Sequence, residues 1–422
     1  MSAGAATLLV AGSMIGTGIF TTTGLLVRDL GSGLAVLLAW VVGGVVALAG
    51  SLCYAELSAA IPRDGGDYAL LTRIYPRPIG FSFGIASFVV GFAAPLAAAA
   101  LGFGHYVRAA LGVGDPATLG IVLVLGLSAV HAFDVRRTNV VQVAATSLVL
   151  ALAAVLVAAG LGRIDVGHLL VSERPLWQAT WSAPFAVGLV SVYYAYSGWN
   201  AAAFVAGEVE EPGRSLPRAL LVGTGLVTGL YLVLNVVFLA SAPANELWGV
   251  TEVAHVAASH LFGAAGATAI SLVIAAALVS LASAMIVAGP RVVTAMGEDY
   301  KLGRLAERAA GGGPAVAVAL QAALSIGMLL TSSFDALITW VGLTLTISDA
   351  LAVAGLVVLR YREPQLLRPF RTPGYPLVPA LFLAVTAWTT VVVVREEPRV
   401  ALASAATVAL GLAAWPFVRR RA

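Results

Sequence analysis

A short glycine-rich stretch near the start of the chain has the composition of a backbone binding site. It centres on Gly16-Thr17-Gly18, inside an apolar run over residues 4–27 that could cross a bilayer as one helix of about 20 residues. Helix interiors disfavour glycine, so we predict a break in the helix there. Irregular backbone at membrane depth is tolerated only where it is buried in protein or lines a cavity. Its free N–H groups could bind a carboxylate, and its free carbonyls an ammonium group.

A second stretch of this kind lies in the apolar run over residues 181–206. Residues 193–200 read Y-Y-A-Y-S-G-W-N, so Ser, Gly and Asn cluster where a membrane helix favours Leu. Gly12 and Gly16 alone would also fit a small-residue packing face, which leaves the first motif open between binding and packing. Two interrupted helices at matching positions of two halves favour a transporter site near the bilayer midplane.

The composition excludes a soluble domain. The 422 residues are 60% hydrophobic and 11% charged, whereas soluble proteins carry about 25% charged residues. The net charge of +3 follows from charge asymmetry between loops, so no nucleic-acid partner is expected. Cys53 is the single cysteine, which excludes an internal disulfide and a thiolate metal cluster. We expect no cofactor and no metal, and the preference for Arg over Lys suggests a bacterial protein.

Twelve apolar segments approach the length of a membrane span. They cover residues 4–27, 33–60, 80–110, 117–133, 138–161, 181–206, 218–242, 262–290, 314–331, 334–359, 375–394 and 399–418. The first has no basic leader and is interpreted as a retained helix, not a signal peptide. Most Lys and Arg residues fall on one side of the membrane, so the positive-inside rule predicts that both termini are cytoplasmic.

The number of spans predicts the internal symmetry. Helices 1–5, within residues 1–161, and helices 6–10, within residues 181–359, start on opposite sides of the membrane because five is odd. A structural repeat between them must therefore be inverted, with helices 11 and 12 of residues 375–418 added outside it. We expect residues 1–422 to form one transmembrane domain.

Four motifs, in order, resemble the amino acid–polyamine–organocation (APC) superfamily of secondary transporters, most closely amino-acid permeases of its L-type branch. They are G-S-M-I-G-T-G-I-F at 12–20, Y-A-E-L at 54–57 followed by P-R-D-G-G-D-Y at 62–68, Y-A-Y-S-G-W-N at 194–200, and R-P-F-R-T-P at 368–373. Each motif is modest alone, but the four in order are specific. The resemblance implies an all-α LeuT-type fold, with ten helices in two inverted repeats and two additional C-terminal helices.

The resemblance also implies where an amino acid would bind. The substrate carboxylate would meet N–H groups around Thr17 and Gly18, and its ammonium group would meet freed carbonyls of helices 1 and 6. Tyr194 would close the site from outside, and Asn200 would hydrogen-bond the broken backbone of helix 6. The expected substrate-binding residues are Ser13, Met14, Gly16, Thr17, Gly18, Tyr194, Ala195, Ser197 and Asn200.

Asp349 is an acidic residue well inside helix 10. It shares one helix face with Thr339, Gly342 and Thr346, and this face must point into the bundle. The carboxyl group could couple a proton, balance a basic substrate, or be structural. Because the middle parts of helices 3, 6 and 8 carry no acid, we favour neutral amino acids over the alternative of cationic amino acids or polyamines with Asp349 as counter-ion.

The coupling ion is left open. Many relatives carry a lysine on helix 5, seven residues after the Gln of a V-Q motif, but here Gln142 is followed at that distance by Val149. Ser280 and Ser283 of helix 8 could coordinate sodium, but we favour small-residue packing as the reason for their presence. Exchange, proton symport and sodium symport remain possible. The loop between helices 3 and 4 has no cysteine, so a disulfide-linked accessory subunit is not expected.

These features predict a secondary active transporter of neutral L-amino acids in a bacterial inner membrane, with the bilayer and the substrate as its partners. An enzyme would need converging acids, nucleophiles or metal ligands at membrane depth, and no such set is visible. A channel would need a filter or a charged ring. A sensor that binds amino acids without transporting them would share the same site. Glu56, at the cytoplasmic end of helix 2, is expected to hold a loop.

Overall fold

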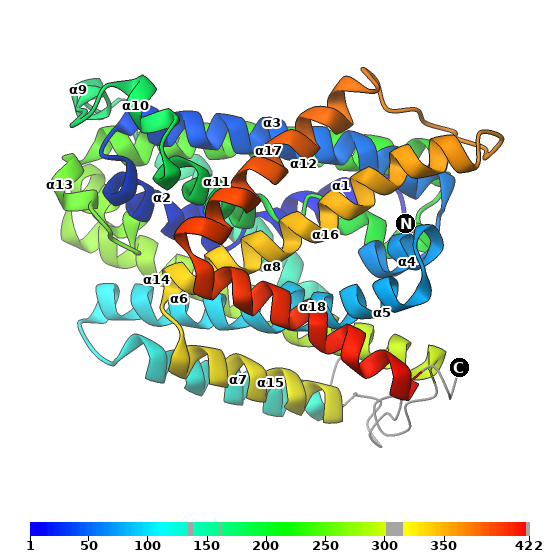
Figure 1. Cartoon of the computed structure of the whole chain (residues 1–422). Coiled ribbons are helices and arrows are strands. Elements are labelled where there is room, and N and C mark those ends of the chain that lie inside the picture. The colour runs from blue at the N-terminus through cyan, green and yellow to red at the C-terminus, as the bar shows by residue number, and fades with distance from the viewer. Residues whose placement is uncertain (134–137, 161, 301–314, 419–422) are drawn as a thin grey trace.

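The computed structural model describes residues 1–133, 138–160, 162–300 and 315–418. Within these ranges the chain is helical, and the one β-bridge joins Ser32 to Ser172. In this described part of the chain, eight helices are long and apolar enough to cross a membrane, and four shorter apolar helices accompany them. Figure 1 shows the long helices packed as one bundle. This architecture agrees with the predicted LeuT-type fold.

The first half of the bundle begins with a helix in two pieces, α1 and α2, as predicted. Its elements are α1 (Ala3–Met14), α2 (Thr17–Leu30), α3 (Gly33–Ala60), α4 (Gly66–Ile74), α5 (Arg77–Ala86), the π-helical η1 (Ser87–Ala93), α6 (Ala94–Leu111), α7 (Pro116–Phe133) and α8 (Thr138–Gly160). The predicted third span is therefore α5, η1 and α6 together. The short α4 occupies a segment that we expected to be a cytoplasmic loop.

The second half repeats the interruption in its first membrane helix. Its elements are α9 (Val166–Leu170), α10 (Leu176–Thr180), α11 (Ala183–Tyr196), the 3-10 helix η2 (Ala201–Glu208), α12 (Pro212–Ser241), α13 (Ala244–Leu247), α14 (Val253–Asp299), α15 (Ala315–Thr331), α16 (Phe334–Arg362), α17 (Leu377–Glu396) and α18 (Pro398–Val418). The helix at the eighth predicted span, α14, starts nine residues earlier than expected and bends at Gly263.

Both interruptions are visible in the backbone dihedral angles. Between α1 and α2, Ile15 has ψ of 96° and Gly16 has φ of −140° and ψ of −151°, so both residues are extended. After α11, Ser197 is extended and Gly198 has φ of +96°, a conformation that side-chain-bearing residues rarely adopt. The two predicted breaks are therefore confirmed.

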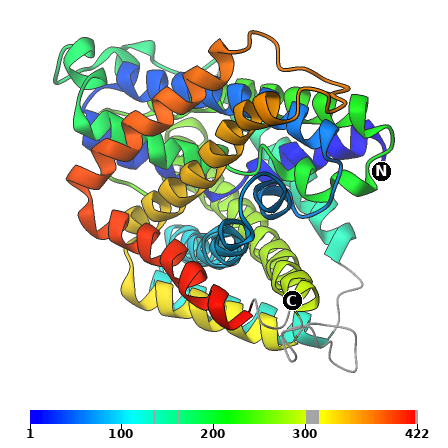
Figure 2. The ribbon, with the colours of Figure 1, turned by 45° about the vertical axis from the view of Figure 1, so that its right-hand side comes forward.

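The last two helices lie on the outer surface of the bundle. In an apolar stretch of 18 residues from each helix, only 28% of the residues are buried in α17 and 22% in α18, compared with 61% in both α3 and α16. In Figure 1 both helices cross the face of the bundle that points toward the viewer, and in the turned view of Figure 2 they lie along one side of it. The remaining apolar surface of α17 and α18 has the character of a lipid-facing surface, as expected for two helices added outside an inverted repeat.

Candidate functional site

The two broken helices touch each other at their breaks. A Cβ atom on Gly18 would lie 2.4 Å from the Ala195 Cα, and one on Gly198 would lie 2.6 Å from the Ser13 carbonyl oxygen. Only glycine allows the two backbones to come this close. Here helix 1 denotes α1 with α2, and helix 6 denotes α11 with η2. Close packing brings the irregular segments of these two helices together, so the binding and packing interpretations of the first motif are compatible.

Tyr231 of α12 holds both breaks and was missed by the sequence analysis. Its hydroxyl oxygen lies 2.5 Å from the Met14 carbonyl oxygen and 3.2 Å from the Ala195 carbonyl oxygen. The side chain is fully buried and packs against Trp40 and Tyr196. The hydroxyl has a single hydrogen, so it satisfies one of these carbonyls at a time. It is the only tyrosine of α12, and a tyrosine well inside a membrane helix was the available signal.

Thr17 and Tyr194 connect the start of α2 to the end of α11. Their hydroxyl oxygens are 2.5 Å apart, and both side chains are buried. Thr17 is the first residue of α2, where backbone N–H groups lack partners within the helix and carry positive partial charge. Thr17, Gly18 and Tyr194 are therefore brought together as expected from the sequence.

Three of the carbonyls expected to face an ammonium group already have a donor within hydrogen-bond distance. The Ser197 N–H donates to the Tyr194 carbonyl at 3.0 Å, and the Met14 and Ala195 carbonyls share the Tyr231 hydroxyl. A carbonyl oxygen has two lone pairs, so each retains capacity for a second donor. Gly16 sits beside α14, where the Leu281 side chain would lie 3.1 Å from an added Cβ.

Asn200 does not have the role that we expected. Its side-chain nitrogen lies 3.2 Å from an Asp349 carboxylate oxygen and 3.5 Å from an Asp67 carboxylate oxygen. The prediction that this amide hydrogen-bonds the broken backbone of helix 6 is therefore wrong. Two buried carboxyl groups nearby accept hydrogen bonds from donors more strongly than neutral carbonyls do, and they draw the amide away from the break.

Asp349 points into the bundle, as its helix face predicted. It is only 4% exposed and accepts hydrogen bonds from the Tyr54 hydroxyl at 2.7 Å and from the Tyr193 hydroxyl at 2.5 Å. Asp67 lies beside it on α4 and is only 3% exposed. Asp67 belongs to the segment between the second and third predicted spans, and its burial was not foreseen because a nine-residue helix gives too weak a periodic signal to reveal a buried face.

The sodium candidates lie on α14. Ser283 is 2.7 Å from the Nε2 atom of His131, which belongs to α7, and Ser280 is buried on the same helix. Leu281 between them reaches Gly16, so this part of α14 passes the break of helix 1. Gln142 and Val149 belong to α8, and their side chains are not among those that the structure describes.

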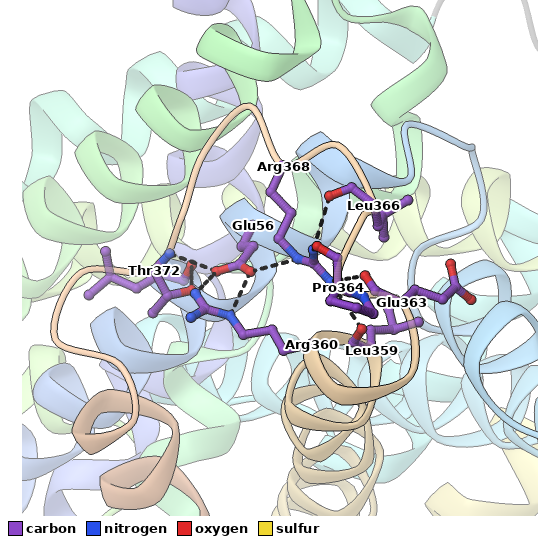
Figure 3. Close-up of polar contacts among 9 residues, drawn as sticks. Glu56, Leu359, Arg360, Glu363, Pro364, Leu366, Arg368 and Thr372 are labelled. Atoms are coloured by element: carbon purple, nitrogen blue, oxygen red, sulfur yellow. Dashed lines mark hydrogen bonds and ion pairs between the residues drawn. The ribbon is translucent and has the colours of Figure 1, made fainter.

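Glu56 fixes a loop at the other end of α3, as expected. Figure 3 shows its carboxylate between Arg360, Arg368 and Thr372. Arg360 donates through Nε at 2.9 Å, the Thr372 N–H donates at 2.7 Å, and the Arg368 Nε lies 3.3 Å away. Arg368 also donates to the carbonyls of Leu359 and Glu363 at the end of α16. This cluster, here called the Glu56 cluster, joins α3, α16 and the following loop.

Comparison with known proteins identifies the family. The family model described as amino acid permease matches residues 3–411. The chain belongs to the amino acid permease family. It is therefore an integral membrane protein of the APC superfamily and not an enzyme.

Curated relatives match along almost the whole chain. A serine/threonine exchanger, SteT, of Bacillus subtilis (strain 168) is 30% identical over 384 residues, which are 89% of this chain and 86% of the relative. Asc-type amino acid transporter 1 of Mus musculus is 29% identical over 405 residues, 93% of this chain and 76% of the relative. Large neutral amino acids transporter small subunit 2 of Homo sapiens is 28% identical over 393 residues, 89% of this chain and 72% of the relative.

Proposed function

We propose that the protein is a secondary active transporter of neutral L-amino acids that works by alternating access. The observation that carries this proposal is the contact between two interrupted helices at Gly18 and Gly198. In transporters built from inverted repeats, such paired interruptions hold the substrate near the bilayer midplane. The names of the relatives, a serine/threonine exchanger and a large neutral amino acids transporter among them, favour the same substrate class.

The substrate would be held mainly by backbone groups. Its carboxylate would accept from the N–H groups of Thr17 and Gly18 at the positive end of α2. Its ammonium group would donate to the carbonyl oxygens freed by the two breaks, those of Ser13, Met14, Tyr194, Ala195 and Ser197. Tyr194, already bonded to Thr17, would close the site on one side.

The surroundings of Asp349 favour neutral over cationic substrates. Its oxygens already accept from Tyr54, Tyr193 and Asn200. A counter-ion for arginine or a polyamine would need an oxygen free to face the substrate side chain. Asp349 is satisfied by the protein itself, which weakens the alternative of a cationic substrate.

Alternating access requires contacts on both sides of the membrane to open in turn. At one end of the bundle Arg28 pairs with Asp335 at 2.9 Å and joins α2 to α16, and at the other the Glu56 cluster joins α3 to α16. The first, second, sixth and seventh predicted spans would rock against the rest; they correspond to α1 with α2, to α3, to α11 with η2, and to α12. Gly16–Gly18 and Ser197–Gly198 would be the hinges.

We place both termini in the cytoplasm of a bacterium. Cys53 is buried, so it offers no thiol for a disulfide-linked accessory subunit.

Competition in proteoliposomes tests this function. The purified protein is reconstituted with an internal pool of one amino acid, and the uptake of labelled neutral amino acids is measured by counterflow. We expect unlabelled neutral L-amino acids to inhibit uptake and arginine or putrescine to have little effect. Dominant inhibition by arginine or putrescine would contradict the assigned substrate class. Binding without any flux would identify a sensor instead.

A further inference from the structure

Two buried aspartates from separate elements share one hydroxyl group. Asp67 on α4 and Asp349 on α16 are 3% and 4% exposed. The Tyr54 hydroxyl oxygen of α3 lies 2.7 Å from the Oδ1 atom of each. Neither carboxyl group takes part in an ion pair within the described part of the chain, so no side-chain cation balances a negative charge on them.

The hydrogen bonds around the pair require one additional hydrogen. Tyr193 donates to Asp349 Oδ2 at 2.5 Å, and Ser348 donates to Asp67 Oδ2 at 2.8 Å. The single hydrogen of Tyr54 can be given to only one of the two Oδ1 atoms. If the other carboxyl group is protonated, it donates to the Tyr54 oxygen while Tyr54 donates onward. Every short contact is then a hydrogen bond.

A small cavity adjoins Tyr193, one of the two tyrosines that contact the pair. A cavity of about 20 Å³ is lined by Tyr193 and Thr346, among other residues, and is large enough for one water molecule. The Thr346 hydroxyl is buried and has no hydrogen-bond partner among the described residues. Thr346 lies one helical turn before Asp349, and Tyr193 contacts both the cavity and Asp349. A water molecule bound by Thr346 there would lie beside Tyr193, whose hydroxyl donates to Asp349.

We propose that Asp67 and Asp349 form a proton-binding site and that this proton is the coupling ion of transport. In the binding step a carboxylate oxygen takes a proton from water, and in release the same O–H bond breaks and the proton returns to water on the other side. A metal cation between the carboxylates is disfavoured, because the Tyr54 oxygen already occupies the position between the two Oδ1 atoms. The inference rests on the proposed transport function.

The location of the pair explains how a proton could act on the substrate site. Tyr193 and Asn200 flank the break of helix 6, and both contact Asp349. Loss of the proton would leave two negative charges facing each other in a poorly solvated interior, which pushes α4 and α16 apart. The hydrogen bonds from Tyr193 and Asn200 to Asp349, which hold the two sides of the break in helix 6, would then be weakened.

The titratable groups that face the pair are few. They are Tyr54 from α3 and Tyr193 from α11, with Ser348 and Asn200 as neutral donors. The other elements packed against α4 and α16, namely α5, η1, α6, η2, α17 and α18, contribute no titratable side chain in contact with either carboxyl group among the described residues. A pH response of the pair therefore belongs to the two aspartates.

Gradient-driven uptake tests the coupling. Wild-type protein, Asp67→Asn, Asp349→Asn and the exposed control Glu397→Gln are reconstituted, and accumulation of a neutral amino acid is measured with an acidic exterior and with equal pH. We expect wild type and control to accumulate at least about fivefold more with the gradient. Both Asn variants should lose this gain but keep counterflow exchange. A retained gain in both, no gain in wild type, or a gain driven only by sodium would overturn the proposal.

Thermal unfolding in detergent without substrate tests the proton site separately. A carboxyl group that keeps its proton in the fold, but would release it above about pH 4 when unfolded, stabilises the fold fully below that pH. This stability is lost as pH rises until the folded pair releases its proton. We expect the Tm of wild type to fall with rising pH and that of the Asn variants to fall less. Equal slopes would overturn the proton site, whereas the absence of any transport by wild type would overturn the transport function alone.

Discussion

Gly18 faces the Ala195 backbone so closely that an added methyl group would lie 2.4 Å from the Ala195 Cα. Gly16, two residues earlier, faces only the end of the Leu281 side chain, at 3.1 Å. The two glycines look alike in the sequence, but one meets a rigid backbone and the other a side chain that can turn. Their substitutions should therefore differ.

Alanine at Gly18 should destabilise the protein more than alanine at Gly16. The Gly18→Ala methyl group can be accommodated only by moving helix 6, which should cost about 1–3 kcal/mol. Gly16→Ala needs a rotation of Leu281, and its extended backbone accepts alanine without strain. Thermal unfolding and amino-acid binding of the two variants should be measured side by side. Equal losses, or a larger loss at Gly16, would contradict the observed contact.

Removing the Tyr231 hydroxyl should loosen both breaks. Tyr231→Phe leaves the Met14 carbonyl without its buried donor, which should cost about 1–3 kcal/mol and weaken amino-acid binding. Tyr75→Phe is a matched control, because its hydroxyl donates to the Leu351 carbonyl at 2.9 Å, away from the breaks. Both variants should unfold more easily, but only Tyr231→Phe should raise the Kd for substrate. A similar Kd in both would remove Tyr231 as a positioning residue.

The sequence revealed the backbone part of the candidate site better than the side chains around it. Glycines in an apolar run have a local physical meaning, so the breaks at Gly16 and Gly198 could be predicted from the chain alone. The partners of Tyr231, Asp67 and Asn200 lie on other helices, and no local pattern specifies which side chains meet across a bundle. Asn200 was misassigned because the second carboxyl group beside it was not foreseen.

At the scale of elements, α16 makes polar contacts with other helices along its whole length. Near its start Asp335 pairs with Arg28 of α2, in its middle Asp349 contacts Tyr54 and Tyr193, and near its end Arg360 joins the Glu56 cluster. The Glu56 carboxylate is fully buried and depends on these donors. The exposed Arg28 pair should contribute much less.

Neutralising Glu56 should destabilise this end of the bundle strongly. Glu56→Gln leaves Arg360 and Arg368 without their buried carboxylate, and breaking such a pair typically costs about 3–5 kcal/mol. Glu363→Gln is the control, because Glu363 pairs with Arg73 at the surface. The Tm of each variant in detergent is the measurement. If both substitutions had the same small effect, the Glu56 cluster would not hold α3 to α16.

The surface control should also show the opposite pH trend from the buried aspartate pair. The hydrogen bond from Arg73 lowers the pKa of Glu363. The small stabilisation from this pair is therefore present above the pKa of the unfolded chain and is lost as pH falls through the lower pKa of the fold. In Glu363→Gln the decline in Tm at acidic pH should be slightly reduced, and an enlarged decline would contradict this sign.

At the scale of the whole molecule, hydropathy was the most informative property of the sequence. All twelve predicted spans contain helices, because apolar runs near the bilayer thickness are a long-range signal that does not depend on packing details. Element ends were less predictable. The start of α14 at Val253, the π-helical turn η1 and the short α4 depend on contacts between helices, which hydropathy does not report.

The orientation in the membrane can be tested with matched cysteines. In a Cys53→Ser background, Gln178→Cys on α10 and Gln365→Cys after α16 each place a thiol at an exposed position. With cytoplasmic termini, a membrane-impermeant thiol reagent should label intact cells only through Gln178→Cys, and lysed cells through both. Labelling of intact cells only through Gln365→Cys would reverse the proposed topology.

The most direct test of the central claim is an experimental structure with a neutral amino acid bound, chosen from the strongest competitor in counterflow. We predict that its carboxylate lies against the N–H groups of Thr17 and Gly18, and that its ammonium group meets carbonyl oxygens freed at the breaks of helices 1 and 6. The same amino acid bound elsewhere, with regular helix running through Gly16 and Gly198, would contradict the account.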